Sequence, residues 1–171
     1  MRQPSDPSPY DVVLLLPDMG LFRENNGASI AELNSAVALV TATGEQLVHQ
    51  NIAFCMAIST KQGLQLHEVR NGGMLRQLLS QWLGLEIESK SGIGLQYFLS
   101  ERLEQYFTRM VIVSAGKYDQ NLSNLDKWIG VTVLSTSDDV KVPSYTTLDS
   151  FCETVVLPSD TQKDDVFRVI C

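Results

Sequence analysis

Apolar residues occur along the chain in two arrangements: short, nearly unbroken runs, and longer segments in which they recur every three or four positions. The runs occupy residues 11–16, 52–59, 110–113 and 131–134. Short apolar runs bounded by turn-forming or polar residues are typical of strands buried on both faces of a sheet. We therefore predict four buried strands, and one further short strand over 85–89.

Helical spacing is clearest in two segments of the first half. A capping box formed by Ser29 and Glu32 opens the first, and the apolar positions that follow predict a helix that ends at Gly44. Residues 36–42 are also compatible with a strand, and this alternative stays open. The second segment covers residues 74–83, where a clean apolar stripe faces polar residues and predicts an amphipathic helix.

Three more helices are predicted in the second half of the chain. One covers residues 91–106, and a short one over 122–128 begins at a second capping box. A third helix is predicted over 147–155, although residues 154–157 are an alternative last strand. The structure of the C-terminal tail stays open.

These elements together predict the fold class. Residues 64–69 follow a turn after the run at 52–59, so the two segments predict a hairpin. Strands that alternate with helices imply right-handed crossovers and a mostly parallel sheet with helices on both faces. The sequence thus predicts an α/β fold, a three-layer α/β/α sandwich with a mostly parallel sheet and one antiparallel hairpin at an edge. Residues 1–10 are expected to be a flexible Pro/Ser leader, and residues 11–171 a single α/β domain.

The charge of the chain limits its partners. The formal net charge is −7 and no window holds a dense basic cluster. A protein that binds nucleic acid neutralises phosphates with Lys and Arg, so we expect no nucleic acid partner. No apolar run approaches the roughly 20 residues of a membrane-spanning helix, so we expect no membrane contact. Residues 138–165 hold seven acids against two lysines, which favours a solvated acidic end or, as the sharper hypothesis, a docking surface for a basic partner.

The cysteines bear on the compartment. Residues 1–10 show no charged-then-apolar signal pattern, and none of the three cysteines has a Cys-x-x-Cys partner. We therefore expect reduced thiols in the cytoplasm rather than disulfides, a zinc site or a redox site. Cys55 and Cys152 are expected to be small buried apolar residues, and Cys171 to be exposed.

Candidate chemistry lies just after the predicted strands, because ligands of open α/β sheets bind outside the carboxyl ends of the strands. Asp18 follows the first buried strand, Lys117 and Asp119 follow the third, and Asp138 and Asp139 follow the fourth. Asp18, Asp138 and Asp139, if they converge, would hold Mg²⁺, which prefers carboxylates and waters. Asp18, Lys117 and Asp119 would then act on the substrate, with the lysine neutralising a phosphate. The alternative is structural, since turns and helix caps also need such residues at strand ends.

Other catalytic motifs are incomplete. Residues 114–117 lack the first glycine of a P-loop, and Tyr118 stands where Ser or Thr would bind Mg²⁺. Residues 92–94 lack the third glycine of a dinucleotide fingerprint. His67 is the better of the two histidines as a candidate base, but no nucleophile marks a partner for it.

Two functions are compatible with these observations. The favoured one is a non-catalytic binding or scaffold domain that needs no cofactor and acts through protein–protein contacts or self-association, with the hairpin offering an edge for strand addition. The alternative is a small Mg²⁺-dependent hydrolase or phosphotransfer enzyme that uses the acids at the strand ends. Whether the chain is an enzyme stays open at this point.

Overall fold

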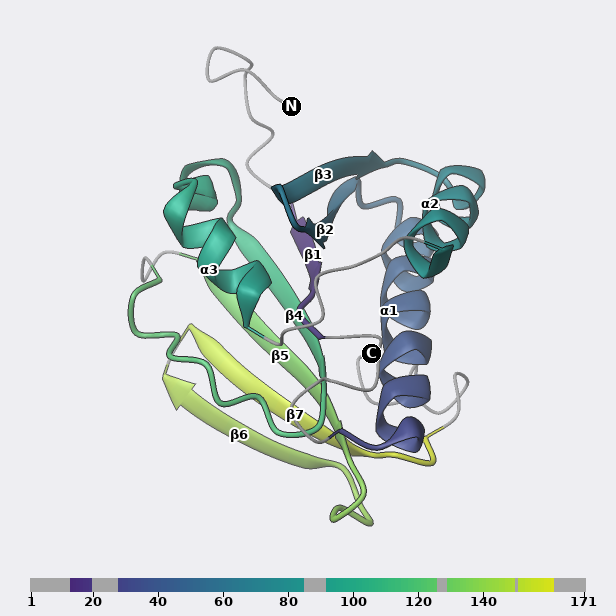
Figure 1. Cartoon of the computed structure of the whole chain (residues 1–171), viewed down its shortest axis with the longest axis vertical. Helices are drawn as coiled ribbons and strands as arrows, with labels where there is room; N and C mark the ends of the chain where they lie inside the picture. Colours follow the sequence, from purple (N-terminus) through teal and green to yellow (C-terminus); the bar gives the residue numbers. More distant parts are fainter. Residues whose placement is uncertain (1–12, 20–27, 85–91, 126–128, 150, 162–171) are drawn as a thin grey trace.

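The computed structural model describes residues 13–19, 28–84, 92–125, 129–149 and 151–161, and it is built around one seven-stranded sheet (Figure 1). The strands lie in the order β3-β2-β1-β4-β5-β7-β6. The elements along the chain are β1 (Val13–Pro17), α1 (Ile30–His49), β2 (Phe54–Thr60), β3 (Gly63–Val69), α2 (Gly72–Gly84), α3 (Ile93–Ser100), the 3₁₀ turn η1 (Leu103–Tyr106), β4 (Arg109–Ala115), β5 (Gly130–Ser137), β6 (Ser144–Asp149) and β7 (Cys152–Pro158).

The predicted architecture is confirmed. β2, β1, β4, β5 and β7 run parallel to one another, and β3 joins the edge as the antiparallel partner of β2, in the predicted hairpin. The opposite edge carries a second antiparallel pair, β6 with β7. Helices cover both faces of the sheet, so the molecule is a three-layer α/β/α sandwich.

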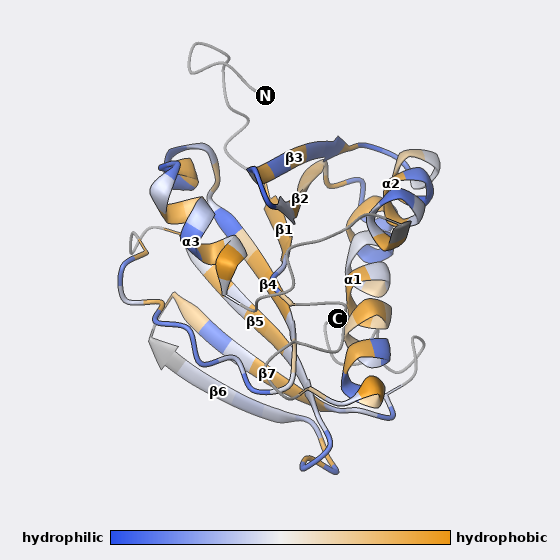
Figure 2. Ribbon diagram, viewed as in Figure 1, coloured by the Kyte–Doolittle hydropathy of each residue, from blue (hydrophilic) through white to orange (hydrophobic). Residues whose placement is uncertain are grey.

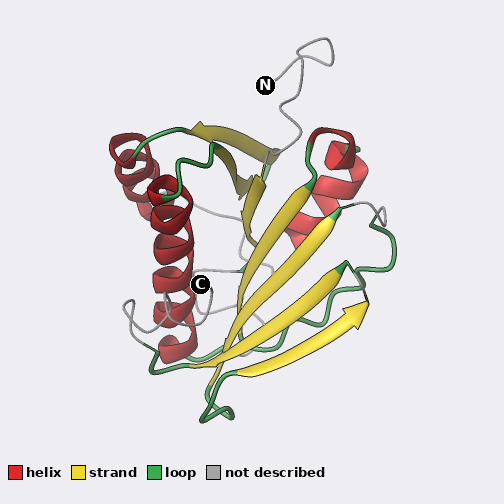
Figure 3. Ribbon diagram, turned by 180° about the vertical axis from the view of Figure 1, so that it is seen from behind, coloured by secondary structure: helices red, strands yellow, loops and turns green. Residues whose placement is uncertain are grey.

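Alternation along each strand divides the core into two parts. Leu15 of β1 faces α1 and α2, whereas Leu14 and Leu16 face α3 and η1, and all three are fully buried. α1 and α2 therefore lie on one side of the sheet and α3 on the other (Figures 1 and 3). The central strands are apolar on both faces, as expected for parallel strands, and are mostly orange in Figure 2.

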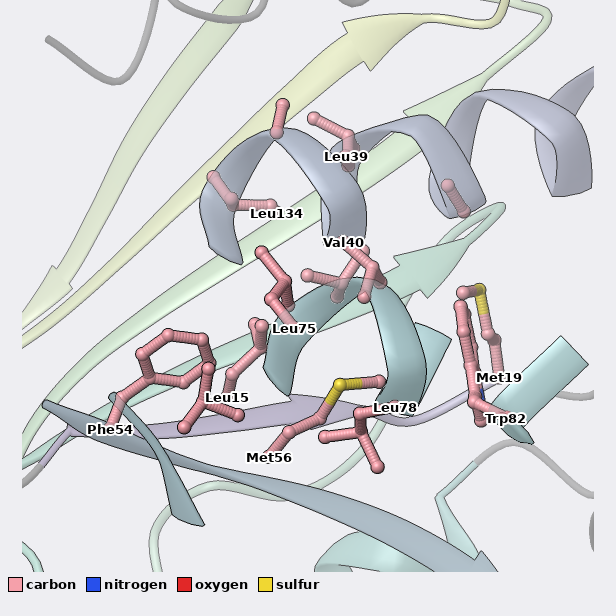
Figure 4. Packing of buried hydrophobic residues seen from close by; sticks show 14 of the residues in the cluster. Leu15, Met19, Leu39, Val40, Phe54, Met56, Leu75, Leu78, Trp82 and Leu134 are labelled. Carbon is pink, nitrogen blue, oxygen red and sulfur yellow. The ribbon is translucent and has the colours of Figure 1, made fainter. Parts of the chain in front are cut away.

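The largest side chains of the α1 and α2 layer fix how these helices lie on the sheet. Figure 4 shows Leu78 of α2 next to Met56 of β2, and Trp82, near the end of the helix, next to Met19. Leu75 and Phe54 belong to the same buried cluster. Trp82 is 2 % exposed. Leu75, Leu78 and Trp82 of the predicted stripe thus face the core, whereas Met74 and Leu83 are exposed.

Helix α1 differs from the prediction at its end. It continues through Gly44 to His49, and residues 36–42 are helical rather than extended. Gly44 is buried, and a Cβ on it would lie 2.9 Å from Cδ1 of Leu75 in α2. This glycine is therefore present because two helices approach each other closely, and not because a helix ends there.

The predicted helix over 147–155 is wrong. β6 and β7 form a hairpin there, in which Tyr145 pairs with Val155 and Thr147 with Glu153. β7 also pairs in parallel with β5 along its whole length. The apolar spacing that suggested a helix is outweighed by this pairing and by the β-branched residues, which favour strands. The alternative last strand before Pro158 is correct.

Two other expected helices are shorter than predicted. α3 begins after Gly92 and ends at Ser100, because Arg102 adopts a left-handed conformation with φ 53° before the separate turn η1. Residues 122–125, the described part of the helix expected over 122–128, form a turn instead. The leader over 1–10, the strand expected over 85–89 and Cys171 lie outside the described residues.

The described helices include none that is long and apolar enough to cross a membrane. Cys152 is buried as expected, whereas Cys55 is only partly buried, and no disulfide joins these two residues.

We predict that Gly44→Leu lowers the free energy of unfolding by about 1–3 kcal/mol, the usual cost of overpacking a filled interior. The leucine side chain would have to displace Leu75 and move α2 away from α1. Urea denaturation measures this difference. Asn34→Leu, which adds the same side chain to the same helix at an exposed position, is the matched control and should stay within about 0.5 kcal/mol of the wild type. Equal losses in both variants would contradict the close packing of the two helices.

Candidate functional site

The carboxyl ends of β1 and β4 form the point where the chain changes direction across the sheet. From β1 the chain crosses to β2 on one side, and β4, on the other side of β1, leads on to β5 and β7. Ligand crevices of open α/β sheets lie at such a point. Asp18 directly follows β1 and Tyr118 follows β4, so these two residues define the centre of the candidate site.

The carboxylate of Asp18 is buried and hydrogen bonded on both oxygens. Its Oδ1 accepts a hydrogen bond of 2.9 Å from the backbone N–H of Gly94, and its Oδ2 accepts one of 2.5 Å from the hydroxyl of Tyr118. Asp18 is 1 % exposed. Its own N–H donates to the carbonyl of Val113 in β4 over 2.9 Å. One side chain therefore joins β1, the first turn of α3 and the loop after β4.

Burial dominates the electrostatics of this pair. It raises the pKa of the Asp18 carboxyl above the ordinary value of 3.8, and the hydrogen bonds from Tyr118 and from the backbone of Gly94, Leu95 and Gly92 lower it by less. Burial and the neighbouring carboxylate also raise the pKa of the Tyr118 phenol above its ordinary range. Tyr118 thus stays protonated and acts as a fixed donor to Asp18.

Gly94 allows the backbone of α3 to approach Asp18. A Cβ at this position would lie 2.8 Å from Oδ1 of Asp18, 2.8 Å from Oγ of Ser59 and 3.0 Å from Cδ1 of Leu16. Ser59, near the end of β2, is 4 % exposed, and among the described residues its hydroxyl has no hydrogen-bond partner. The site is therefore packed tightly around the glycine backbone.

A second polar cluster joins the first turn of α1 to the carboxyl end of β5. Glu32 completes the predicted capping box with Ser29, and its Oε1 also accepts a hydrogen bond of 2.9 Å from the N–H of Asp138. The hydroxyl of Thr136 donates to the backbone carbonyl of Glu32 over 2.7 Å. Hydrogen bonds with Ser159 and Ser29 hold the pKa of the Asp138 carboxyl below its usual range. Glu32 and Asp138 therefore anchor α1 over the sheet.

The residues that the sequence grouped lie in different surroundings. Lys117 and Asp119 are exposed and form an ion pair of 3.3 Å with each other, next to Tyr118 in the chain. Asp138 and Asp139 are exposed at the end of β5, where Asp138 belongs to the Glu32 cluster. Within the described ranges, no three His, Cys, Asp or Glu side chains are arranged to hold a metal ion.

Three contributors to the Asp18 cluster escaped the sequence analysis. In the sequence, Tyr118 is only a mismatch to a P-loop, and Gly94 belongs to an incomplete glycine motif. Ser59 is the last residue of a predicted strand. Their relation to Asp18 spans 76 residues for Gly94 and 100 for Tyr118, so no local spacing signals it. The one indication that these residues lie near Asp18 is the rule that the carboxyl ends of parallel strands meet at one edge of the sheet.

A cleft of about 350 Å³ lies beside Tyr118 on the α3 side of β5 and β7. Leu122, Phe151 and Cys152 give it apolar walls, and Gln120 and Asn121 add side-chain amides. Among the described residues, none that lines it is charged, so this part of the lining offers no acid–base pair.

Comparisons with known proteins identify the fold. The sequence matches no family model and no curated protein. Among solved structures, the chain is similar to the crystal structure of the SpRpn10 VWA domain, with a TM-score of 0.54 and 9 % sequence identity, over 93 % of this chain and 94 % of that one. At this identity the likeness shows a shared VWA-like α/β/α fold, and function must be argued from the site.

We predict that the stability of Asp18→Asn relative to the wild type rises as pH increases above 3.8. Because the folded-state pKa of Asp18 is raised above 3.8, the folded chain keeps this proton where the unfolded chain has lost it. The stability linked to the proton is complete below pH 3.8 and declines as pH rises through the folded-state pKa. Urea titrations from pH 3 to pH 8 should show the stability difference, variant minus wild type, rising with pH across that window. A difference independent of pH would refute the raised pKa.

The hydrogen bond between Tyr118 and Asp18 supplies the matched comparison. Tyr118→Phe should lower the free energy of unfolding by about 1–3 kcal/mol, since the buried Oδ2 of Asp18 loses its donor. In the Asp18→Asn background the same change should cost less, because that oxygen is absent.

We predict that Gly94→Ala is destabilising and that Ser59→Ala partly rescues it. The new methyl group would contact Oδ1 of Asp18 and Oγ of Ser59 at 2.8 Å each, and removing the serine hydroxyl relieves one of these contacts. Ser59→Ala alone should cost little, since that hydroxyl has no partner within the described residues. Thermal unfolding of the wild type, the two single variants and the double variant gives the coupling energy between the two substitutions. Strictly additive effects would count against this packing.

Proposed function

We propose that this chain is a non-catalytic domain that acts by binding other proteins. The observation that carries the proposal is the state of Asp18. Both of its oxygens accept hydrogen bonds from the chain itself, and the side chain is 1 % exposed. A carboxylate in this state binds the fold together and is not presented to a substrate or a metal ion.

The remaining candidate residues support the same proposal. Lys117 and Asp119 pair with each other at the surface, with side-chain exposures of 87 % and 69 %. Exposed pairs of this kind contribute little stability and create no shielded reaction site. The net charge of −7 disfavours nucleic acid and suits a protein partner with a basic surface. Cys55 and Cys152, which form no disulfide with each other, agree with the proposed location in the cytoplasm.

The exposed edges of the sheet are the surfaces that such a role would use. β3 and β6 end the sheet on either side, and edge strands present backbone groups to another chain. The partner on this proposal is a different protein or a second copy of the chain. Either of them would leave the Asp18 cluster untouched.

The test compares the wild type with Asp18→Asn. We expect both tagged chains to recover the same stoichiometric partner from the source cells, or to form the same oligomer by light scattering, because Asp18 is structural. Millimolar Mg²⁺ should leave the melting temperature of both unchanged, since a ligand that binds only the folded state raises it. A Mg²⁺-induced rise that Asp18→Asn abolishes would support the Mg²⁺-dependent enzyme instead. A strict monomer without a partner would contradict the proposal.

A further inference from the structure

The two edges of the sheet differ in how well they are protected. On β3, the N–H of Leu64 donates to Oε1 of Glu101 over 3.4 Å, and Glu68 forms an ion pair of 2.9 Å with Arg70. Charged side chains and a covering group are the usual means by which proteins keep edge strands from pairing. Figure 2 shows β3 as largely hydrophilic and β6 as pale. β3 is therefore a protected edge.

β6 is an open edge. Residues 144–147 are Ser-Tyr-Thr-Thr, uncharged and exposed throughout. Tyr145 is 63 % exposed, and Val142, just before the strand, is 72 % exposed. β6 pairs with β7 on one side and ends the sheet on the other (Figure 1). Aromatic and β-branched residues favour strand pairing, so the backbone groups on the outer side of β6 can receive another strand.

A groove lies beside β6 on the face of the sheet that carries α1. It has a volume of about 280 Å³, and Tyr145, Val155 and Leu134 give it apolar walls. Thr43 of α1 also lines it, is 6 % exposed, and has a hydroxyl without a hydrogen-bond partner in the described parts of the chain. Arg109 and Glu153 add one charge of each sign to the lining. The groove can take a side chain from a neighbouring strand.

Charge decides between the possible occupants. At one end of β6, where Ser144 pairs with Val156 of β7, three acids are exposed: Asp138, Asp139 and Asp160. At the other end, the exposed Glu153 of β7 lies opposite Thr147. Lys141 is the nearby cation at the first end, and Arg109, which lines the same groove as Glu153, is a cation at the other, so the excess of acids lies at the Ser144 end. A second copy would bring the same acids and a net charge of −7 to this edge, and like charges across a strand pair are destabilising. A positively charged strand is complementary to it.

We propose that β6 binds an extended, basic segment of another protein as an additional strand of the sheet. The inference rests on the proposed protein-binding function and names the surface and the chemistry of the partner. Backbone hydrogen bonds along residues 144–147 hold the segment, its apolar side chains on the α1 side pack beside Tyr145, and its lysines or arginines face the acids near the Ser144 end of β6.

The probe is a labelled nine-residue peptide in which lysine alternates with valine or threonine, tested by fluorescence anisotropy on the full chain. We expect binding that weakens as salt rises, and slower hydrogen exchange of the amides of β6 in the complex. The same peptide with glutamate for lysine, or with proline at every third position, should not bind. Equal binding of the glutamate peptide, or no binding of the lysine peptide, overturns the proposal.

Two variants with the same added charge locate the site. Thr146→Lys places a cation on β6 and should weaken binding at least tenfold, whereas Gln65→Lys places one on β3 and should change it less than twofold. Equal weakening by both would mean non-specific attraction and would overturn the proposal. Folding of both variants is checked by their melting temperatures, and Asp139→Asn with Glu153→Gln provides a second, milder disruption of the site.

The outcomes also separate this inference from the broader function. If Thr146→Lys recovers the cellular partner as well as the wild type does, the chain binds protein through another surface and the β6 proposal fails alone. If the wild type is a dimer that Thr146→Lys dissociates, the occupant is a second copy rather than a basic segment. If the wild type has neither a partner nor a second copy, the broader function fails as well.

Discussion

Burying β1 between two layers of helices places the carboxylate of Asp18 where water cannot reach it, and the arrangement around the strand ends depends on how this charge is accommodated. A buried carboxylate is costly unless its oxygens accept hydrogen bonds. Gly94 and Tyr118 supply these bonds, one from the first turn of α3 and one from the loop after β4. The same contacts that stabilise the charge fix the position of a helix and a loop against the central strand.

This requirement explains why an acid at a strand end need not be catalytic. The sequence places acids after three strands, and the rule for open α/β sheets marks all of them as candidates. Catalysis or metal binding needs at least one oxygen directed towards a ligand. Asp18 directs both of its oxygens to donors in the chain, and Glu32 accepts from Ser29 and Asp138 in the same manner. The clusters at this edge tie helices to the sheet.

Local signals predicted the parts of the fold that local interactions determine. The capping box at Ser29 and Glu32, the stripe of α2 and the hairpin of β2 with β3 all appear as expected. The errors arise where long-range contacts decide. Gly44 resembles a helix end until α2 packs against it, and residues 147–155 have helical spacing until β7 pairs with β5. The partners of Asp18 lie 76 and 100 residues away in the sequence, and no pattern within a window of the chain identifies them.

The hairpin that the sequence analysis missed also changes which edge of the sheet is open. With β2 and β3 as the single antiparallel pair, β3 would be the natural surface for strand addition, but Glu101 and the charges on β3 protect it. β6 forms the other edge and is uncharged over residues 144–147, and the exposed acids Asp138, Asp139 and Asp160 lie near the end of β7 where Ser144 pairs with Val156. If β6 receives a strand as proposed, its acidic surroundings disfavour a second copy of this chain and favour a partner of opposite charge. The acidity of residues 138–165, which the sequence leaves as a solvated end or a docking surface, is described by the structure as far as Asp160, and these acids lie near the edge where we propose that a basic strand binds.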